Sequence, residues 1–278
     1  MSEHAFKQID VFSDEPLKGN PLAVVFQADS LSEAQLAAFA RWTNLSETTF
    51  LLKPTTAEAD YRVRIFTPGG ELMFAGHPTL GSCHAWLQGG GQPRQPECVV
   101  QECGVGLVRV RRDGTRSAFA APPLKLQPVS ADELATAIAA LGLAREQVRE
   151  ARWLDMGTRW LGLLLGGADE VLAVKPRSGA MRDFAKVGLI GPHPEGASCQ
   201  YEVRGFAEPI GVPEDPVTGS LNAGLARWLI DAGIAPPRYV AAQGQALGRA
   251  GRVHVERIGA DIWIGGHSVT RIEGRLSL

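Results

Sequence analysis

The sequence predicts an α+β fold with two pseudo-symmetric lobes, each a mainly antiparallel, barrel-like sheet wrapped around a central helix. A loop-to-helix pattern occurs once in each half of the chain, which indicates a duplicated architecture. The helices that follow these loops carry few charges and many small residues, so most of their circumference is expected to be buried. The predicted strands also follow one another too closely for the helical crossovers of a parallel sheet.

The length of the chain agrees with two lobes. Its 278 residues suffice for two domains, each of about 140 residues. The Pro122-Pro123 pair marks the best boundary, so we expect one lobe over residues 1–121 and another over 122–278. The extreme C-terminal strand could return to the first lobe.

The composition excludes several classes of protein. The formal net charge is −2 and the basic residues are dispersed, so no nucleic-acid partner is indicated. The N-terminal residues lack a signal-peptide pattern, and no apolar run approaches the roughly 18 residues of a membrane span, so we expect a cytoplasmic protein with no membrane partner. The four cysteines show no CxxC spacing and are expected to be free thiols.

In the first half, apolar and β-branched runs predict strands, and a capping box predicts a helix. Ser32 and Gln35 form this box at the start of a helix over residues 32–42. The expected strands cover residues 6–12, 21–26, 48–52, 61–66, 98–110 and 116–120.

The second half repeats this layout. A helix is expected over residues 132–141, with Ser130 or Asp132 near its N-cap. The expected strands cover residues 161–165, 171–174, 198–206, 253–257 and 262–264.

The first loop reads Gly76-His77-Pro78-Thr79 and opens a helix that stops at Gly89. Pro78 suits the first helical turn, where its missing N–H costs nothing. Free N–H groups at a helix N-terminus attract anions, and a neighbouring glycine lets a ligand approach the backbone. We therefore expect Gly76, Pro78 and Thr79 to bind a small carboxylate substrate.

The second loop runs from Asp215 to Ser220 and opens a helix that stops at Gly233. By the same reasoning, Thr218 and Gly219 are expected to bind the substrate. Two well-capped structural helices would give a similar pattern. The duplication, with polar residues in both loops, favours the binding role.

Glu47 lies between a helix-ending turn and an apolar strand, which is an unusual place for a carboxylate. If the strand is buried, partial desolvation would raise the pKa of this carboxyl toward the operating pH, as a general acid/base requires. The alternative is a carboxylate that caps the turn or forms a salt bridge.

His77 and Asp215 occupy the two loops at the helix entrances, and their difference indicates a divided task. Asp215 could accept from a substrate amine or hydroxyl, or act as a plain N-cap, while His77 donates to a carboxylate or polarised oxygen. Ser220 offers a hydroxyl and an N–H at the same point. It is not expected to be a nucleophile, because no Gly-x-Ser-x-Gly elbow surrounds it.

No cofactor and no metal are expected. The sequence has no Walker A motif and no Gly-x-Gly-x-x-Gly fingerprint after a strand. His77 and His84 make a weak metal pair, since they share a helix face only if His77 belongs to the helix.

These motifs resemble those of the PhzF-like family of phenazine-biosynthesis isomerases, which is similar in fold to diaminopimelate epimerase. The likeness runs nearly end to end. It rests on Asp10-Val11-Phe12, Gly19-Asn20-Pro21-Leu22-Ala23-Val24, Asn44-Leu45-Ser46-Glu47-Thr48-Thr49-Phe50, Arg64-Ile65-Phe66-Thr67-Pro68, Gly76-His77-Pro78-Thr79-Leu80-Gly81, Glu214-Asp215-Pro216-Val217-Thr218-Gly219-Ser220, Gln243-Gly244 and Gly248-Arg249.

The resemblance implies two similar lobes with the active site in the cleft between them, and a homodimer. It also implies proton transfer without a cofactor, with Glu47 as the acid/base and His77, Asp215 and Ser220 as its companions. Diaminopimelate epimerase uses paired cysteines in its two loops, which this chain lacks there. Asn222 and Gly205 depart from residues common in the family, which leaves the substrate open.

We therefore expect a cofactor-independent isomerase that moves a proton between carbons of a small cyclic amino acid or carboxylate, similar to trans-2,3-dihydro-3-hydroxyanthranilate isomerase. One alternative is an amino-acid racemase or epimerase, which needs a second base such as His77 or Asp215. Another is a binding protein that keeps the cleft and lacks catalysis.

Overall fold

The structure is a computed structural model that describes residues 2–278, apart from the side chain of residue 113. The chain forms two compact units. The first holds the chain up to Ala120 together with Gly265–Leu278, and the second holds Ala121–Ile264. The sequence-based boundary was placed after residue 121. The last strand crosses from the second unit into the first, so the final residues are part of the first unit.

In the first unit, a closed ring of strands surrounds helix α2 (Gly76–Gln88). Strand β17 closes the ring by pairing with β1 on one side and β8 on the other. Around the ring, the strands are β1 (Glu3–Val11), β2 (Asn20–Val25), β3 (Glu47–Leu52), β4 (Tyr61–Thr67), β6 (Cys98–Cys103), β7 (Gly106–Asp113), β8 (Arg116–Ala120) and β17 (Asp261–Ser277). The short strand β5 (Gly70–Leu72) pairs with β4.

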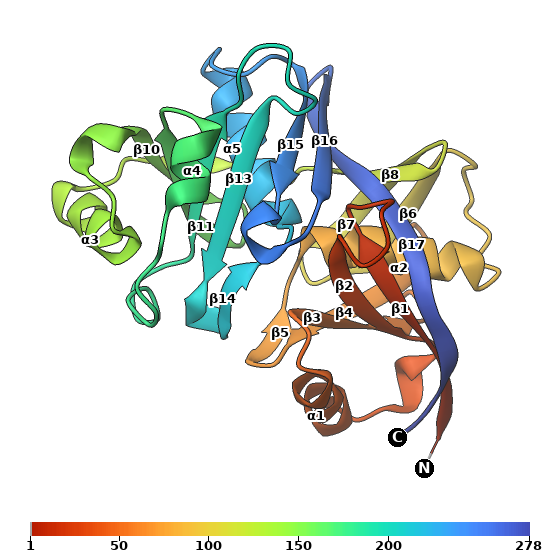
Figure 1. The fold of residues 1–278 in the computed structure, drawn as a ribbon. Helices are drawn as coiled ribbons and strands as arrows, with labels where there is room; N and C mark the ends of the chain where they lie inside the picture. The colour runs from red at the N-terminus through yellow and green to blue at the C-terminus, as the bar shows by residue number, and fades with distance from the viewer. Residues whose placement is uncertain (1) are drawn as a thin grey trace. The chain divides into compact units, whose positions relative to one another are not determined.

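Helix α1 (Glu33–Thr43) lies on the outside of this ring (Figure 1). The predicted capping box is present, because Ser32 accepts from the backbone of Gln35 and the Gln35 side chain accepts from Ser32. The buried face of α1 packs on Phe50 and Phe66, which point outward from β3 and β4. Strand residues alternate in direction, so Glu47 and Thr49 point to the inside of the ring. The Ser82 hydroxyl of α2 donates to Thr49, which agrees with this direction.

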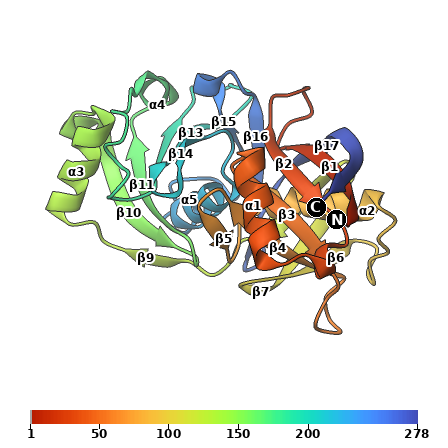
Figure 2. The same ribbon diagram turned by 90° about the horizontal axis from the view of Figure 1, so that it is seen from below.

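In the second unit, strands surround helix α5 (Gly219–Asp231) (Figure 2). Helices α3 (Ala131–Leu141) and α4 (Ala168–Ala173) cover the outside and share an apolar core with β10 to β13. The strands are β9 (Lys125–Gln127), β10 (Val148–Asp155), β11 (Arg159–Leu165), β12 (Val187–Pro192), β13 (Tyr201–Ala207), β14 (Val212–Asp215), β15 (Arg238–Gln243) and β16 (Gly251–Ile258). Short 3₁₀ turns complete the chain at residues 28–30, 145–147, 208–210 and 245–247.

The two units repeat one order of pairing. A parallel pair (β2–β3, β11–β12) is followed by an antiparallel neighbour (β4, β13), a short strand (β5, β14) and the central helix. The next strand then pairs in parallel with that neighbour (β6 with β4, β15 with β13). This repeat confirms the predicted α+β fold of two similar lobes. It also gives a register, in which Thr48 opposite Phe66 corresponds to Val187 opposite Phe206.

Some predicted elements were wrong. Residues 171–174, predicted as a strand, fall mostly within helix α4, because Ala168 and Val171 form a buried helical face and Asp169 and Glu170 occupy its favourable first turn. The predicted strand over 98–110 is a hairpin that turns before Gly106, which has a φ of 99°. Strands β5, β9, β10, β12, β14 and β15 were missed. The first central helix begins at Gly76, so His77 belongs to the helix and not to the preceding loop.

No helix within residues 2–278 combines the length and the apolar character needed to cross a membrane.

We expect Gly81→Ala to destabilise the protein, although alanine usually favours a helix. A Cβ atom at position 81 would lie 2.5 Å from Leu22 Cδ2 and 3.0 Å from Val11 Cγ2, and both side chains are fully buried. Such overpacking costs about 1–3 kcal/mol, which exceeds the gain in helix propensity of roughly 1 kcal/mol. Urea unfolding would measure the change. Gly274→Ala, where a Cβ meets nothing within 4 Å, is the control and should unfold like the parent.

Candidate active site

The N-terminal end of α2 lies buried inside the first unit. Its N-cap, Ala75, makes no side-chain cap, and Gly76, His77, Pro78 and Thr79 are all buried. Thr79 turns its hydroxyl back onto the Ala75 carbonyl, at 2.9 Å. The N-cap residue therefore provides no side-chain cap for the backbone N–H groups of the first turn, and the positive end of the helix dipole lies behind them. Such an end is suited to hold a carboxylate.

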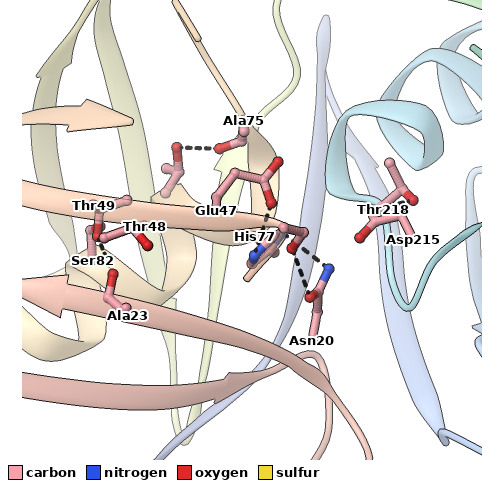
Figure 3. Close-up of polar contacts among 12 residues, drawn as sticks. Asn20, Ala23, Glu47, Thr48, Thr49, Ala75, His77, Ser82, Asp215 and Thr218 are labelled. Atoms are coloured by element: carbon pink, nitrogen blue, oxygen red, sulfur yellow. Dashed lines mark hydrogen bonds and ion pairs between the residues drawn. The ribbon is translucent and has the colours of Figure 1, made fainter. Parts of the chain in front are cut away.

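Glu47 lies at the start of β3 on the inner side of the ring, and only 8% of its surface is exposed. Its Oε2 atom is 3.5 Å from Nε2 of His77 (Figure 3). The side chains were predicted as acid/base and companion, and the structure brings them together. A carboxylate largely removed from water is a stronger base toward a carbon acid than a solvated one.

His77 is 2% exposed, and this burial lowers the pKa of its imidazole from 6.5 to about 3. The ring is therefore neutral at physiological pH. Its Nδ1 atom is 3.2 Å from Nδ2 of Asn20 (Figure 3). The hydroxyl of Ser46 donates to Oδ1 of Asn20 at 3.3 Å. An amide nitrogen only donates, so Nδ1 accepts and the single ring proton resides on Nε2, facing Glu47. His77 is thus a neutral hydrogen-bond donor.

The N-terminal end of α5 carries a different polar group. Thr218 is its N-cap, and the Thr218 hydroxyl donates to Oδ2 of Asp215 at 2.7 Å (Figure 3). Gln243 supports the turn, since its Oε1 accepts from the Thr218 backbone at 3.0 Å and from Asn222 at 2.9 Å. Its Nε2 donates to the Asp215 carbonyl at 3.1 Å. This network holds the Asp215 carboxylate, which is 7% exposed, in a fixed place.

Ser220 is the second residue of α5 and is 8% exposed. The indole Nε1 of Trp160, on β11, donates to Ser220 Oγ at 3.3 Å in a buried contact. An indole nitrogen only donates, so the Ser220 oxygen accepts from it and its own proton can point to another acceptor. The Ser220 hydroxyl can therefore act as a donor.

The predicted residues fall into two groups. Glu47 and His77, with Gly76, Pro78 and Thr79, lie around the start of α2 in the first unit. Asp215, Thr218, Gly219 and Ser220 lie around the start of α5 in the second. Sequence reasoning missed the supporting roles of Asn20, Trp160 and Gln243. Asn20 and Gln243 lie in motifs that the sequence analysis named, but a motif does not show which side chain each residue contacts. No local sequence pattern distinguishes Trp160.

His84 does not extend the site, although it shares helix α2 with His77. Its Nε2 atom is 3.1 Å from the Thr270 hydroxyl of β17. Within the part of the chain that the structure describes, no three His, Cys, Asp or Glu side chains are grouped so that they could hold a metal ion.

Comparison with known proteins gives matches over nearly the whole chain. The family model described as "Phenazine biosynthesis-like protein" matches residues 9–274. A trans-2,3-dihydro-3-hydroxyanthranilate isomerase of Pseudomonas aeruginosa is 33% identical, with 99% of this chain and 100% of the relative covered. A protein of Schizosaccharomyces pombe named antisense-enhancing sequence 1 is 37% identical, with 99% of each chain covered.

A solved structure has the same fold. The crystal structure of a phenazine biosynthesis protein of the PhzF family from Bacillus anthracis aligns with a TM-score of 0.86 over 100% of both chains, at 21% identity.

Because His77 is buried and neutral, we expect the protein to lose stability as the pH falls. The unfolded chain binds a proton at this residue near pH 6.5, whereas the folded protein binds it only near pH 3. The contribution of the neutral His77 to the free energy of unfolding is therefore complete above pH 6.5. It is lost between pH 6.5 and 3, at about 1.4 kcal/mol per pH unit. Urea unfolding at pH 7.5, 6.0 and 5.0 would measure it.

The matched variant is His77→Gln, in which this part of the pH dependence should vanish. The pKa of His84 is also lowered by burial, to about 4, and its contribution stays in both proteins. Equal slopes in the parent and the variant would contradict the assignment of a neutral His77.

Proposed function

This chain belongs to the phenazine biosynthesis-like protein family and is an isomerase, and we propose that it moves a proton between two carbons of a small cyclic amino acid without a cofactor. The family was predicted from the motifs, and the match over residues 9–274 confirms it. The observation that supports the reaction best is the buried Glu47 carboxylate next to a neutral donor, His77.

The proposed step needs one base that acts twice. The Glu47 carboxylate removes a proton from a carbon next to a double bond, and the electron pair of the broken C–H bond shifts the double bond by one position. The same carboxyl group returns the proton to the far carbon, so atoms and charge balance. A positioned acid/base contributes about 10²–10⁴-fold to such a reaction. The remaining acceleration comes from donors aimed at the charge that develops.

The other polar groups have binding and stabilising roles in this proposal. The first turn of α2 binds the substrate carboxylate, and His77 Nε2–H donates to Glu47 or to a substrate oxygen. In the second unit, Asp215 is the acceptor and Ser220 the donor at the start of α5. The substrate class rests on the name of the Pseudomonas aeruginosa relative, a dihydro-hydroxyanthranilate isomerase.

The hydrogen-bond pattern favours the isomerase over a racemase or epimerase. Inversion of a stereocentre needs a second base on the opposite face of the carbon. His77 is unsuited to this role, because Nδ1 accepts from Asn20 and Nε2 carries the proton. Asp215 is then the candidate for a second base.

We expect Glu47→Gln to abolish turnover while substrate binding persists, because the amide keeps the shape and loses the base. Proton NMR in D₂O on trans-2,3-dihydro-3-hydroxyanthranilate and a panel of cyclic amino acids would follow both migration of the double bond and exchange of carbon-bound hydrogen. Glu71→Gln removes a carboxylate that is paired with Arg64 on the outside of β4 and β5, and it should keep the parent rate.

A Glu47→Gln protein with full activity would refute the assigned base. Exchange with inversion, lost in Asp215→Asn, would instead establish the epimerase. Binding to the panel without any exchange by the parent protein would favour a non-catalytic binding protein.

We also propose that the protein works as a homodimer in the cytoplasm. All four cysteines are free, as a reducing compartment would keep them. A groove of about 390 Å³ lies beside α1, and its lining includes Phe6, Phe39, Trp42 and Leu276. Trp42 stacks on Phe39 and is 80% exposed, which is typical of a contact surface between subunits.

We expect Trp42→Glu to shift the protein from dimer to monomer, because the new charge would be buried in the interface. Light scattering coupled to gel filtration would give the mass of each form. Ile258→Glu places a charge on another exposed apolar side chain, outside the groove, and should leave the mass unchanged. A parent protein that is monomeric at all concentrations would refute the proposal.

A further inference from the structure

The side chain of Asn20 links the turn before β3 to the start of α2. Asn20 is fully buried at the first position of β2, where it pairs with Val11 of β1. The turn before it is fixed, because the backbone N–H of Gly19 donates to Asp10 at 2.9 Å. A buried amide in a fixed backbone has little freedom to move, and it must satisfy its polar atoms with protein partners.

The amide of Asn20 lies between two side-chain partners. Ser46 donates its hydroxyl to Oδ1 at 3.3 Å, and Nδ2 then faces Nδ1 of His77 at 3.2 Å. The amide nitrogen has protons and no available lone pair, so the imidazole nitrogen must accept. In a neutral imidazole, the other nitrogen then carries the proton.

This orientation matters for the reaction. Nε2 of His77 is 3.5 Å from Glu47 Oε2, so the proton on Nε2 sits on the ring nitrogen that is close to the carboxylate. In the opposite tautomer, a lone pair would face the carboxylate and the two groups would repel. The correct tautomer stabilises the ionised base and can also donate to a substrate oxygen when Glu47 takes up a proton.

We propose that Asn20 is a positioning residue that fixes His77 as the Nε2–H tautomer. Asn20 acts through His77 and touches no reacting atom. The effect on catalysis rests on the proposed function, whereas the tautomer is a property of the resting protein.

The direct test is long-range ¹H–¹⁵N correlation NMR of the histidine side chains, with His77 assigned through its loss in His77→Gln. In the parent protein, we expect His77 Nδ1 to resonate as an unprotonated nitrogen and Nε2 as a protonated one. In Asn20→Asp, which keeps the size of the side chain and replaces the donor by an acceptor, Nδ1 should become protonated. A parent protein with the proton on Nδ1 would overturn the proposal, and this result does not require the variant to fold. A folded Asn20→Asp variant with an unchanged His77 tautomer would also overturn it.

Kinetics give a second readout. We expect Asn20→Asp to lower kcat by about 10- to 100-fold, the usual effect of losing an oriented hydrogen bond to a charged or ligating group. KM should change little. In the His77→Gln background, the same Asn20 substitution should cost almost nothing more, since its effect passes through the imidazole. Additive losses in this double-mutant cycle would show that Asn20 acts elsewhere and would overturn the catalytic part of the proposal.

The two failures are distinguishable. If the parent protein turns over no substrate, the proposed function fails while the NMR measurement still decides the tautomer. If turnover depends on Glu47 but the tautomer is reversed, the isomerase stands and the role of Asn20 does not.

Discussion

The burial of α2 and α5 within rings of strands is the constraint on which the rest of the structure depends. A helix without a solvent face needs small side chains wherever a strand crosses it, as Gly81 shows in α2 and Gly188 shows in the strand beside α5. The same burial keeps water away from the N-terminal turns of both helices. Their N–H groups and dipoles thus act in a medium of low dielectric constant, where they attract an anion most strongly.

The two units share one architecture, but the polar side chains at the starts of their central helices differ, and the proposed chemistry depends on this difference. The first unit offers a base and a neutral donor, and the second offers an acceptor, Asp215, and a donor, Ser220. In both units a buried neighbour donates a hydrogen bond to the polar side chain and so leaves its own proton for another acceptor. Asn20 does this for His77, and Trp160 does it for Ser220. A proton-transfer site needs donors and acceptors with fixed directions. A group that could either donate or accept would often present a lone pair where the reaction requires a proton.

The sequence predicted the elements whose signals are local. A capping box located α1, an N-cap residue near Ser130 located α3, and the glycine-bounded loops located both central helices. Strand β12 was missed because Gly188 and Gly191 weaken its pattern, and these glycines are required by close contacts with Leu221 and with the Gly167 backbone. Glu47 could be selected because a carboxylate at the start of an apolar strand is unusual. Its pairing with His77, and the support of His77 by Asn20, depend on contacts between distant segments that no local pattern encodes.

The ring around α2 has a consequence for the synthesis of the protein. Its closing strand comes from residues 265–278, which pair with β1 at the other end of the chain, so that Glu3 lies opposite Ser277. While a ribosome makes the second unit, β1 and β8 of the first have open edges and α2 lacks part of its cover. Contacts between such distant residues form late, and open edges invite pairing with other chains. The nascent protein therefore depends on the second unit folding quickly, or on a chaperone that shields the unfinished ring.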